Sequence, residues 1–141
     1  GHLCLGTLHT KDAPSTIDRI IDVFPPHQQT QIRVQLAVAL QGVVSQILIP
    51  RLDGAGRVAA REIMVMTPAI SNLVREGKTH MIYGAVDTGA KFGMVSMDQS
   101  LGTLVKQGLI DMEEACKRCH NLPTLEALTG RKASKASQAM G

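Results

Sequence analysis

The first stretch of the chain is almost continuously apolar. From Gly1 to Thr10 the sequence reads GHLCLGTLHT, and it turns polar at Lys11 and Asp12. A short apolar run with a polar end predicts a strand that is buried on both faces of a sheet. His9 and Thr10 would lie at the carboxyl end of that strand, the edge where open α/β sheets meet phosphates and other ligands. An ordinary core strand that ends in histidine accounts for the same pattern.

Helical spacing predicts two helices after this strand, beginning near Asp12 and at Pro26. Their apolar stripes are Ile17, Ile20, Ile21 and Phe24 in the first helix, and Ile32, Leu36 and Leu40 in the second. The β-branched run 43–49 and the alternating run 57–66 flank turn residues at 53–56. This pattern predicts a β-hairpin, which we expect to join, antiparallel, the sheet that contains the first strand.

The remainder of the chain predicts helices with clear start signals. These signals are Thr67 with Pro68, Ser96 with Gln99, and Asp111 with Glu114. Gly77 and Gly108 follow the first two of these helices and are typical of helix ends. Residues 80–86 are expected to form a loop or a short helix, and a last helix spans about 123–128.

The helix that follows Thr67 is amphipathic. Its apolar face carries Ala69, Ile70, Leu73 and Val74, and its polar face carries Ser71, Asn72, Arg75 and Glu76. An amphipathic helix with one solvated side explains this pattern without any binding partner.

Composition and charge exclude some classes of function. A chain of 141 residues has the length of one domain. It holds no Trp, one Tyr and two Phe, which argues against the aromatic stacking platforms of nucleic-acid binders. Arg131, Lys132 and Lys135 account for the formal net charge of +3, so the body of the chain offers no basic face for nucleic acid.

Several features of the sequence predict the cellular compartment of the protein and how the chain begins and ends. It has three cysteines, no signal-peptide pattern and no apolar run near the ~18 residues of a membrane span, which indicates a reducing, cytoplasmic setting. The chain begins with Gly inside a predicted strand, as expected of a piece of a longer protein. Beyond Gly130 the sequence lacks apolar periodicity, and residues 131–141 are expected to form a disordered basic tail.

Cys116, Cys119 and His120 match the C-x-x-C-H pattern of haem attachment. However, both cysteines also continue the apolar stripe of Met112 and Ala115, which gives them a packing role. A structural zinc site would need four ligands, and no second Cys/His cluster with suitable spacing is present, so no metal site is predicted.

Two further patterns resemble catalytic motifs without completing them. Asp87–Ala90 reads D-T-G-A, as in aspartic proteases, but one such loop is only half of the paired site that those enzymes need. Gly84–Lys91 approaches the phosphate-binding P-loop, yet Phe92 stands where Ser or Thr should reach magnesium. The sequence therefore contains no P-loop, and no Ser-His-Asp order is apparent.

Four stretches of the chain resemble the ATPases that power secretion and type IV pili. These stretches are GHLCLGTLHTKDA, DRIIDVFPPHQQTQIRVQLAVALQGVVSQILIP, GRVAAREIMVMTPAISNLVREGK and TGAKFGMVSMDQSLGTLVKQGLI. The first looks like the His box of this superfamily, and the resemblance runs from Gly1 to about Gly130. It is nearest to the PilT-type ATPases of type IV pilus retraction, or twitching motility. The pilus-extension and type II secretion ATPases are an alternative, although they usually carry a four-cysteine zinc module that is absent from this sequence.

The resemblance implies an α/β fold class. Residues 1–66 would be the C-terminal portion of a RecA-like P-loop ATPase core, with its late strands including the hairpin, and residues 67–130 a helical C-terminal region. The whole protein would be a hexameric motor that binds ATP and Mg²⁺ and works with the type IV pilus machinery at the inner face of the cytoplasmic membrane. In this family the P-loop and the magnesium ligands precede the His box, so we expect this chain to be inactive alone. A non-catalytic interaction module is the alternative from another class.

The resemblance also assigns site residues. His9 would sense the γ-phosphate of ATP, His2 would be the other histidine of the His box, and Thr10 would contact the nucleotide. Because His2 and His9 are seven positions apart, a regular strand would point them to opposite faces, which argues against a shared metal site. The retraction motif AIRNLIRE corresponds to Ala69, Ile70, Ser71, Asn72, Leu73, Val74, Arg75 and Glu76, with Ser71 in place of an arginine.

Overall fold

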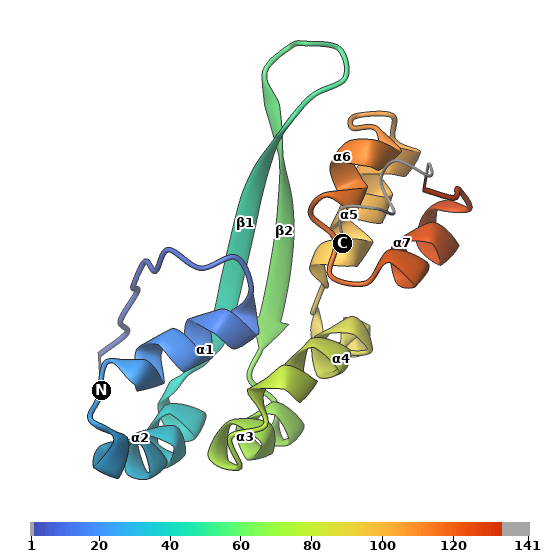
Figure 1. Cartoon of the computed structure of the whole chain (residues 1–141). Coiled ribbons are helices and arrows are strands. Elements are labelled where there is room, and N and C mark those ends of the chain that lie inside the picture. The colour runs from blue at the N-terminus through green and yellow to red at the C-terminus, as the bar shows by residue number, and fades with distance from the viewer. Residues whose placement is uncertain (1, 134–141) are drawn as a thin grey trace.

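The computed structural model describes residues 2–133. In chain order its elements are α1 (Ala13–Asp22), α2 (Pro26–Ala39), β1 (Gly42–Pro50), β2 (Arg57–Val65), α3 (Pro68–Arg75), the 3₁₀ turn η1 (Thr79–Met81), α4 (Ile82–Asp87), the 3₁₀ turn η2 (Ala90–Phe92), α5 (Met97–Lys106), α6 (Met112–Cys116) and α7 (Leu122–Thr129). A long two-stranded ribbon forms the centre (Figure 1). Helices α1 to α4 gather around one end of the ribbon, and α5 to α7 lie beside β2.

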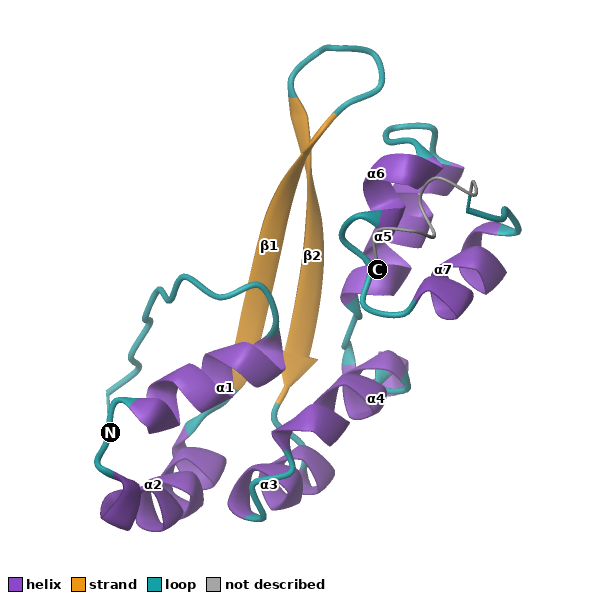
Figure 2. Ribbon diagram, in the orientation of Figure 1, coloured by secondary structure: helices purple, strands orange, loops and turns teal. Residues whose placement is uncertain are grey.

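The predicted hairpin is confirmed. β1 and β2 pair antiparallel from Gly42 opposite Val65 to Pro50 opposite Arg57. Gly54 and Gly56 in the connecting turn have φ angles of 69° and 99°, a left-handed conformation that glycine adopts without strain. Figure 2 shows the twist of the ribbon, which follows from the handedness of L-residues. The α/β fold class is confirmed with it.

The predicted first strand is wrong for this chain. Residues 2–10 form no strand, and Leu3 and Leu5 are 84% and 88% exposed. A strand that is buried on both faces needs a neighbour on each side to pair its backbone groups. In the described part of the chain, the sheet contains β1 and β2 alone, so the hairpin does not join a sheet that includes this segment.

Two hydrophobic cores lie along the ribbon. The first fills the space among α1 to α4 and the near end of β2, with Ala13, Ile17, Ile21, Ala37, Met64, Ile70, Val74, Ile82, Val86 and Met94. The second joins the far part of the hairpin to α5, α6 and α7, with Ile49, Ala60, Met97, Leu101, Leu104, Val105, Ile110, Ala115 and Leu125. The first core draws residues from both sides of the predicted boundary at residue 66, and the division into 1–66 and 67–130 stays a prediction.

The predicted helix starts are confirmed. The side chains of Asp12 and Asp111 accept the backbone N–H of Ser15 and Glu114 at 2.8 and 2.7 Å. Thr67 caps α3 in the same way, and Ser96 forms a reciprocal capping box that begins α5. Such caps satisfy amides that have no partner within the helix, and each typically contributes about 1 kcal/mol.

Two further observations concern the tail and the membrane. The predicted basic tail lies largely outside the described residues, although the N–H of Ala133 donates to Glu126 Oε1 at 2.7 Å. Within residues 2–133, no helix combines the length and apolarity that crossing a membrane requires.

Candidate functional site

The segment that carries His9 is fixed to the first turns of α1. The hydroxyls of Thr10 and Thr16 are 2.6 Å apart, and the Thr16 hydroxyl donates to the carbonyl of Asp12 at 2.8 Å. Because Thr16 has a single hydroxyl hydrogen, Thr10 is the donor in the pair. The side chain of His9 is exposed one residue before this anchor. The backbone around His9 is therefore held while its imidazole remains accessible.

An open surface hollow adjoins His9 and Thr10. Its other lining residues are Lys11, Ser15, Asp18, Arg19, Asp22 and Val23. The hollow thus contains both basic and acidic side chains, and Asp18 also accepts the Thr79 hydroxyl at 3.1 Å, which ties α1 to η1. Lys11 and Arg19 are the cations among these lining residues.

The N-terminus of α1 follows Thr10 closely and would ordinarily attract an anion. Here two carboxylates already occupy it. Asp12 accepts the N–H of Ser15, and Glu62 accepts the N–H of Ala13 at 2.7 Å. A phosphate at this place would compete with both carboxylates, so we expect its contacts to come from side chains that line the hollow, such as His9, Lys11 and Arg19.

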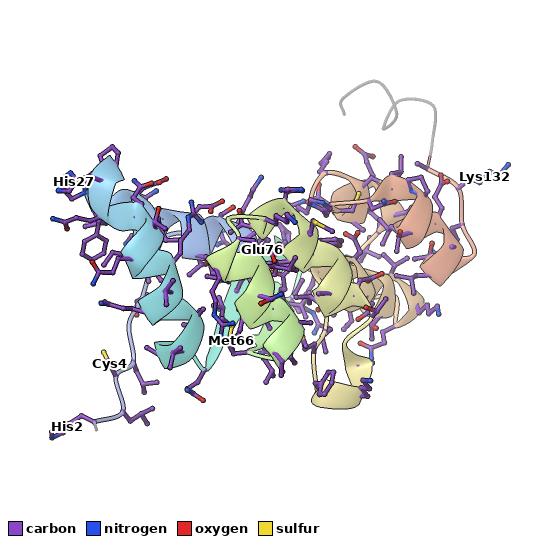
Figure 3. All side chains as sticks on the ribbon, turned by 90° about the horizontal axis from the view of Figure 1, so that it is seen from below. His2, Cys4, His27, Met66, Glu76 and Lys132 are labelled. Carbon is purple, nitrogen blue, oxygen red and sulfur yellow. The ribbon has the colours of Figure 1, made fainter. Side chains whose placement is uncertain are left out.

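His2 does not lie on the regular strand that the sequence predicts. Residues 2–10 are not a regular strand, so the count that placed His2 and His9 on opposite faces does not apply. His2 is exposed and projects away from the helices together with Cys4 (Figure 3). Within residues 2–133, no group of three or more His, Cys, Asp or Glu side chains is arranged to hold a metal ion.

Helix α3 presents the stretch AISNLVRE. Ile70 and Val74 are fully buried in the first core, and Leu73 packs against that core. Asn72 and Glu76 are exposed, and Glu76 lies on the outer side of the helix in Figure 3.

Two positions of α3 differ from the helical-wheel prediction. Ser71 was placed on the solvated face, but it is partly buried and its hydroxyl donates to the carbonyl of Ala37 in α2 at 3.0 Å. Ala69 was placed on the apolar face and is exposed. The reason is that α2 packs beside α3 and covers part of the polar face, which a wheel of one helix does not contain.

The C-x-x-C-H pattern lies where α6 joins α7. Cys116 and Cys119 are half-buried against the second core, and the Cys119 thiol donates to the Cys116 carbonyl at 3.3 Å. The His120 ring stacks on Tyr83 with ring centroids 3.9 Å apart. These contacts give all three residues of the pattern a packing role.

We expect the thiols to react unequally. Burial, with the charge of Asp98, raises the pKa of Cys119 to about 11, so at pH 8 only about one thiol in a thousand is the reactive thiolate. Cys4 is exposed. Alkylation with iodoacetamide at pH 8, followed by peptide mass spectrometry, should label Cys4 well before Cys119, and the order should vanish in denaturant. Equal rates in the folded protein would contradict the burial of Cys119.

The D-T-G-A stretch has a structural role. The Ser96 hydroxyl donates to Asp87 Oδ1 at 2.7 Å, and Gln99 Nε2 donates to the Asp87 carbonyl at 2.9 Å. Asp87 therefore joins the end of α4 to the capping box of α5.

Sequence reasoning missed two buried acids, Glu62 and Asp98. Glu62 is 1% exposed and lies on β2 between the inward-facing Ala60 and Met64. An acid at an inward position of an alternating strand was the available signal. Asp98 is fully buried, and its two oxygens accept the N–H groups of His120 and Asn121 at 2.7 and 2.8 Å. Asp98 also lies in the first turn of α5, where the helix dipole favours an acid.

Comparison with known proteins defines the class. The family described as type II/IV secretion system protein matches residues 1–122. The chain belongs to this family.

Within the family, the resemblance to PilT-type proteins predicted from the sequence is confirmed. The chain is 51% identical over 115 residues to the type IV pilus retraction ATPase PilT of Pseudomonas aeruginosa, covering 82% of this chain and 33% of that protein. It is 49% identical over 121 residues to a twitching motility protein of Neisseria gonorrhoeae, covering 86% of this chain and 32% of that protein. The chain therefore spans about a third of the length of these relatives.

Solved structures agree with this assignment. The crystal structure of the pilus retraction motor PilT with bound ADP matches with a TM-score of 0.77 and 43% identity, over 90% of this chain and 35% of that one. The ATPase DotB of Legionella pneumophila matches with a TM-score of 0.60 and 20% identity, over 76% of this chain and 29% of that one, which shows the fold alone.

Proposed function

We propose that this chain is the C-terminal part of a motor ATPase that powers type IV pilus retraction. The observation that carries the proposal is the 51% identity to a protein named for that activity. The family match over residues 1–122 also includes both the His9 segment and α3. The full-length protein would act as a homo-hexamer, peripheral to the inner face of the cytoplasmic membrane, where ATP turnover with Mg²⁺ drives the inner-membrane pilus machinery.

Within this proposal, His9 contacts the γ-phosphate of ATP. Support comes from its exposed imidazole and from the anchor at Thr10. Phosphoryl transfer is promoted mainly by positioning and by stabilising the charge that develops on the transferred group. An imidazole that donates a hydrogen bond from a fixed backbone can stabilise this developing charge.

Thr10 serves in the proposal as an anchor more than as a ligand. Its hydroxyl hydrogen is used by Thr16, so towards a nucleotide the hydroxyl could only accept a hydrogen bond. His2, exposed at the other end of the segment, has no described contact that assigns it a role in this chain.

We propose that the retraction motif contacts its partner through the exposed side of α3. Asn72, Arg75 and Glu76 supply its polar groups, and Asn72 and Arg75 also line a hollow that includes residues of α2. The Ser71 hydroxyl is used by its hydrogen bond to α2, although Ser71 also lines this hollow. In this protein we therefore assign the retraction contact to Asn72, Arg75 and Glu76.

The proposal predicts weak nucleotide binding by the chain alone. Backbone amides and a lysine of a P-loop supply most of the grip on the β- and γ-phosphates, and this sequence contains no such loop. Calorimetric titration of the 141-residue chain with ATP should give no micromolar dissociation constant, while the full-length protein should bind and hydrolyse ATP. Tight binding by the chain alone, or no turnover by the full-length protein, would contradict the proposal.

A further inference from the structure

Glu62 is a buried acid that connects three elements. It lies on β2, and its Oε1 accepts the N–H of Ala13, the first residue of α1, at 2.7 Å. The two residues are 49 positions apart in sequence, so this bond fixes α1 to the hairpin. The other oxygen, Oε2, is buried and has no protein partner among the described residues.

The environment of Glu62 explains why an acid is tolerated inside the protein. Burial is the largest influence and raises the pKa of Glu62 above its ordinary value, while the amides of Ala13 and Met97 oppose this shift and favour the carboxylate. Ala13 and Met97 are the first residues of α1 and α5, so the carboxyl group lies near the positive ends of two helix dipoles.

A cavity of about 280 Å³ adjoins Glu62 and contains the other groups that surround it. Its lining includes Lys11, Tyr83, Lys117, Arg118, Cys119 and His120. Lys117 and Arg118 are already paired with Glu114, at 2.9 and 2.6 Å. The carboxylate of Glu62 is therefore stabilised mainly by backbone amides, and its hydrogen bond in the structure is the one from the Ala13 N–H at the start of α1.

The start of α1 is also the end of the His9 segment. Ala13 follows His9 by four residues, and Thr10, Asp12 and Thr16 are linked by hydrogen bonds across the same turn. We infer that Glu62 is a positioning residue, which holds the start of α1 against the hairpin and thereby places His9. This inference rests on the proposed function of the full-length protein as an ATPase.

The kinetic test uses the full-length protein with Glu62→Ala and Glu62→Gln. Glu62→Ala should lower kcat for ATP hydrolysis on the order of tenfold or more with little change in KM, because a small misplacement of a catalytic group mainly affects the transition state. Glu62→Gln keeps an acceptor for the Ala13 amide and should recover most of the lost rate. In the double variant with His9→Ala, Glu62→Ala should cause no further loss, since it acts through His9.

A matched control separates positioning from general destabilisation. Leu125 is fully buried in the second core, and Leu125→Ala should lower the melting temperature without a selective loss of kcat below that temperature. Equal effects of Leu125→Ala and Glu62→Ala on kcat, or a loss in the double variant equal to the product of the single losses, would overturn the inference.

A second readout does not depend on ATP turnover. Hydrogen exchange of the backbone around 9–16 in the full-length protein should be faster in Glu62→Ala by about tenfold or more, and near the wild-type rate in Glu62→Gln. Unchanged exchange in Glu62→Ala would overturn the positioning role. Absence of turnover in the wild type would instead overturn the proposed function, and a normal rate in His9→Ala would overturn the sensor role of His9. In both cases hydrogen exchange would still test whether Glu62 holds the start of α1.

Discussion

His9→Ala in the full-length protein is expected to lower ATP turnover about a hundredfold while changing nucleotide affinity only slightly. A hydrogen-bond donor that meets developing charge typically contributes ~3 kcal/mol in the transition state and less in the ground state. In this chain His9 is exposed and makes no side-chain hydrogen bond within the described residues, so its removal should not affect stability. Steady-state turnover, calorimetric affinity and melting temperature, measured together, distinguish these effects.

His27→Ala is the matched control for this prediction. His27 is also exposed, but it lies on α2 and does not line the hollow beside His9. It should keep wild-type turnover. His2→Ala should leave the melting temperature unchanged, because the exposed His2 has no packing to lose. Turnover that survives in His9→Ala would exclude the sensor role.

Asp98→Ala is expected to cause a large loss of stability. Asp98 is fully buried, and its two oxygens accept the N–H groups of His120 and Asn121, which join α6 to α7. Removing the carboxylate leaves both amides without a partner in a partly buried place. The cost should be about 3 kcal/mol, since hydrogen bonds to charged groups are stronger than neutral ones. The melting temperature should fall by about 10 °C.

Denaturant unfolding of the 141-residue chain measures this loss. Asp98→Asn keeps one acceptor oxygen and should lose roughly half as much as Asp98→Ala. Glu113→Ala, which removes an exposed partner of Lys117 at 3.1 Å, should stay within about 0.5 kcal/mol of wild type. An Asp98→Ala variant as stable as Glu113→Ala would show that the link between α5 and the last two helices does not depend on this carboxylate.

The sequence alone determined the features that depend on near neighbours. Helix caps at Asp12, Thr67, Ser96 and Asp111 act over three residues, so their chemistry is visible in the local sequence. The hairpin was equally visible, because turn residues and the alternation on both sides specify it together. The family was also evident from the sequence, since its motifs are local stretches.

Only the tertiary structure decided the features that depend on contacts between distant residues, because the two partners of each contact are far apart in sequence. Whether residues 2–10 form a strand depends on neighbouring strands, and the described sheet supplies none. Ser71 faces α2 because α2 packs beside α3, a contact across 34 positions. Glu62 binds the start of α1 across 49 positions. A pattern along the chain records which residues prefer burial, but it does not record which distant backbone group a buried polar atom will meet.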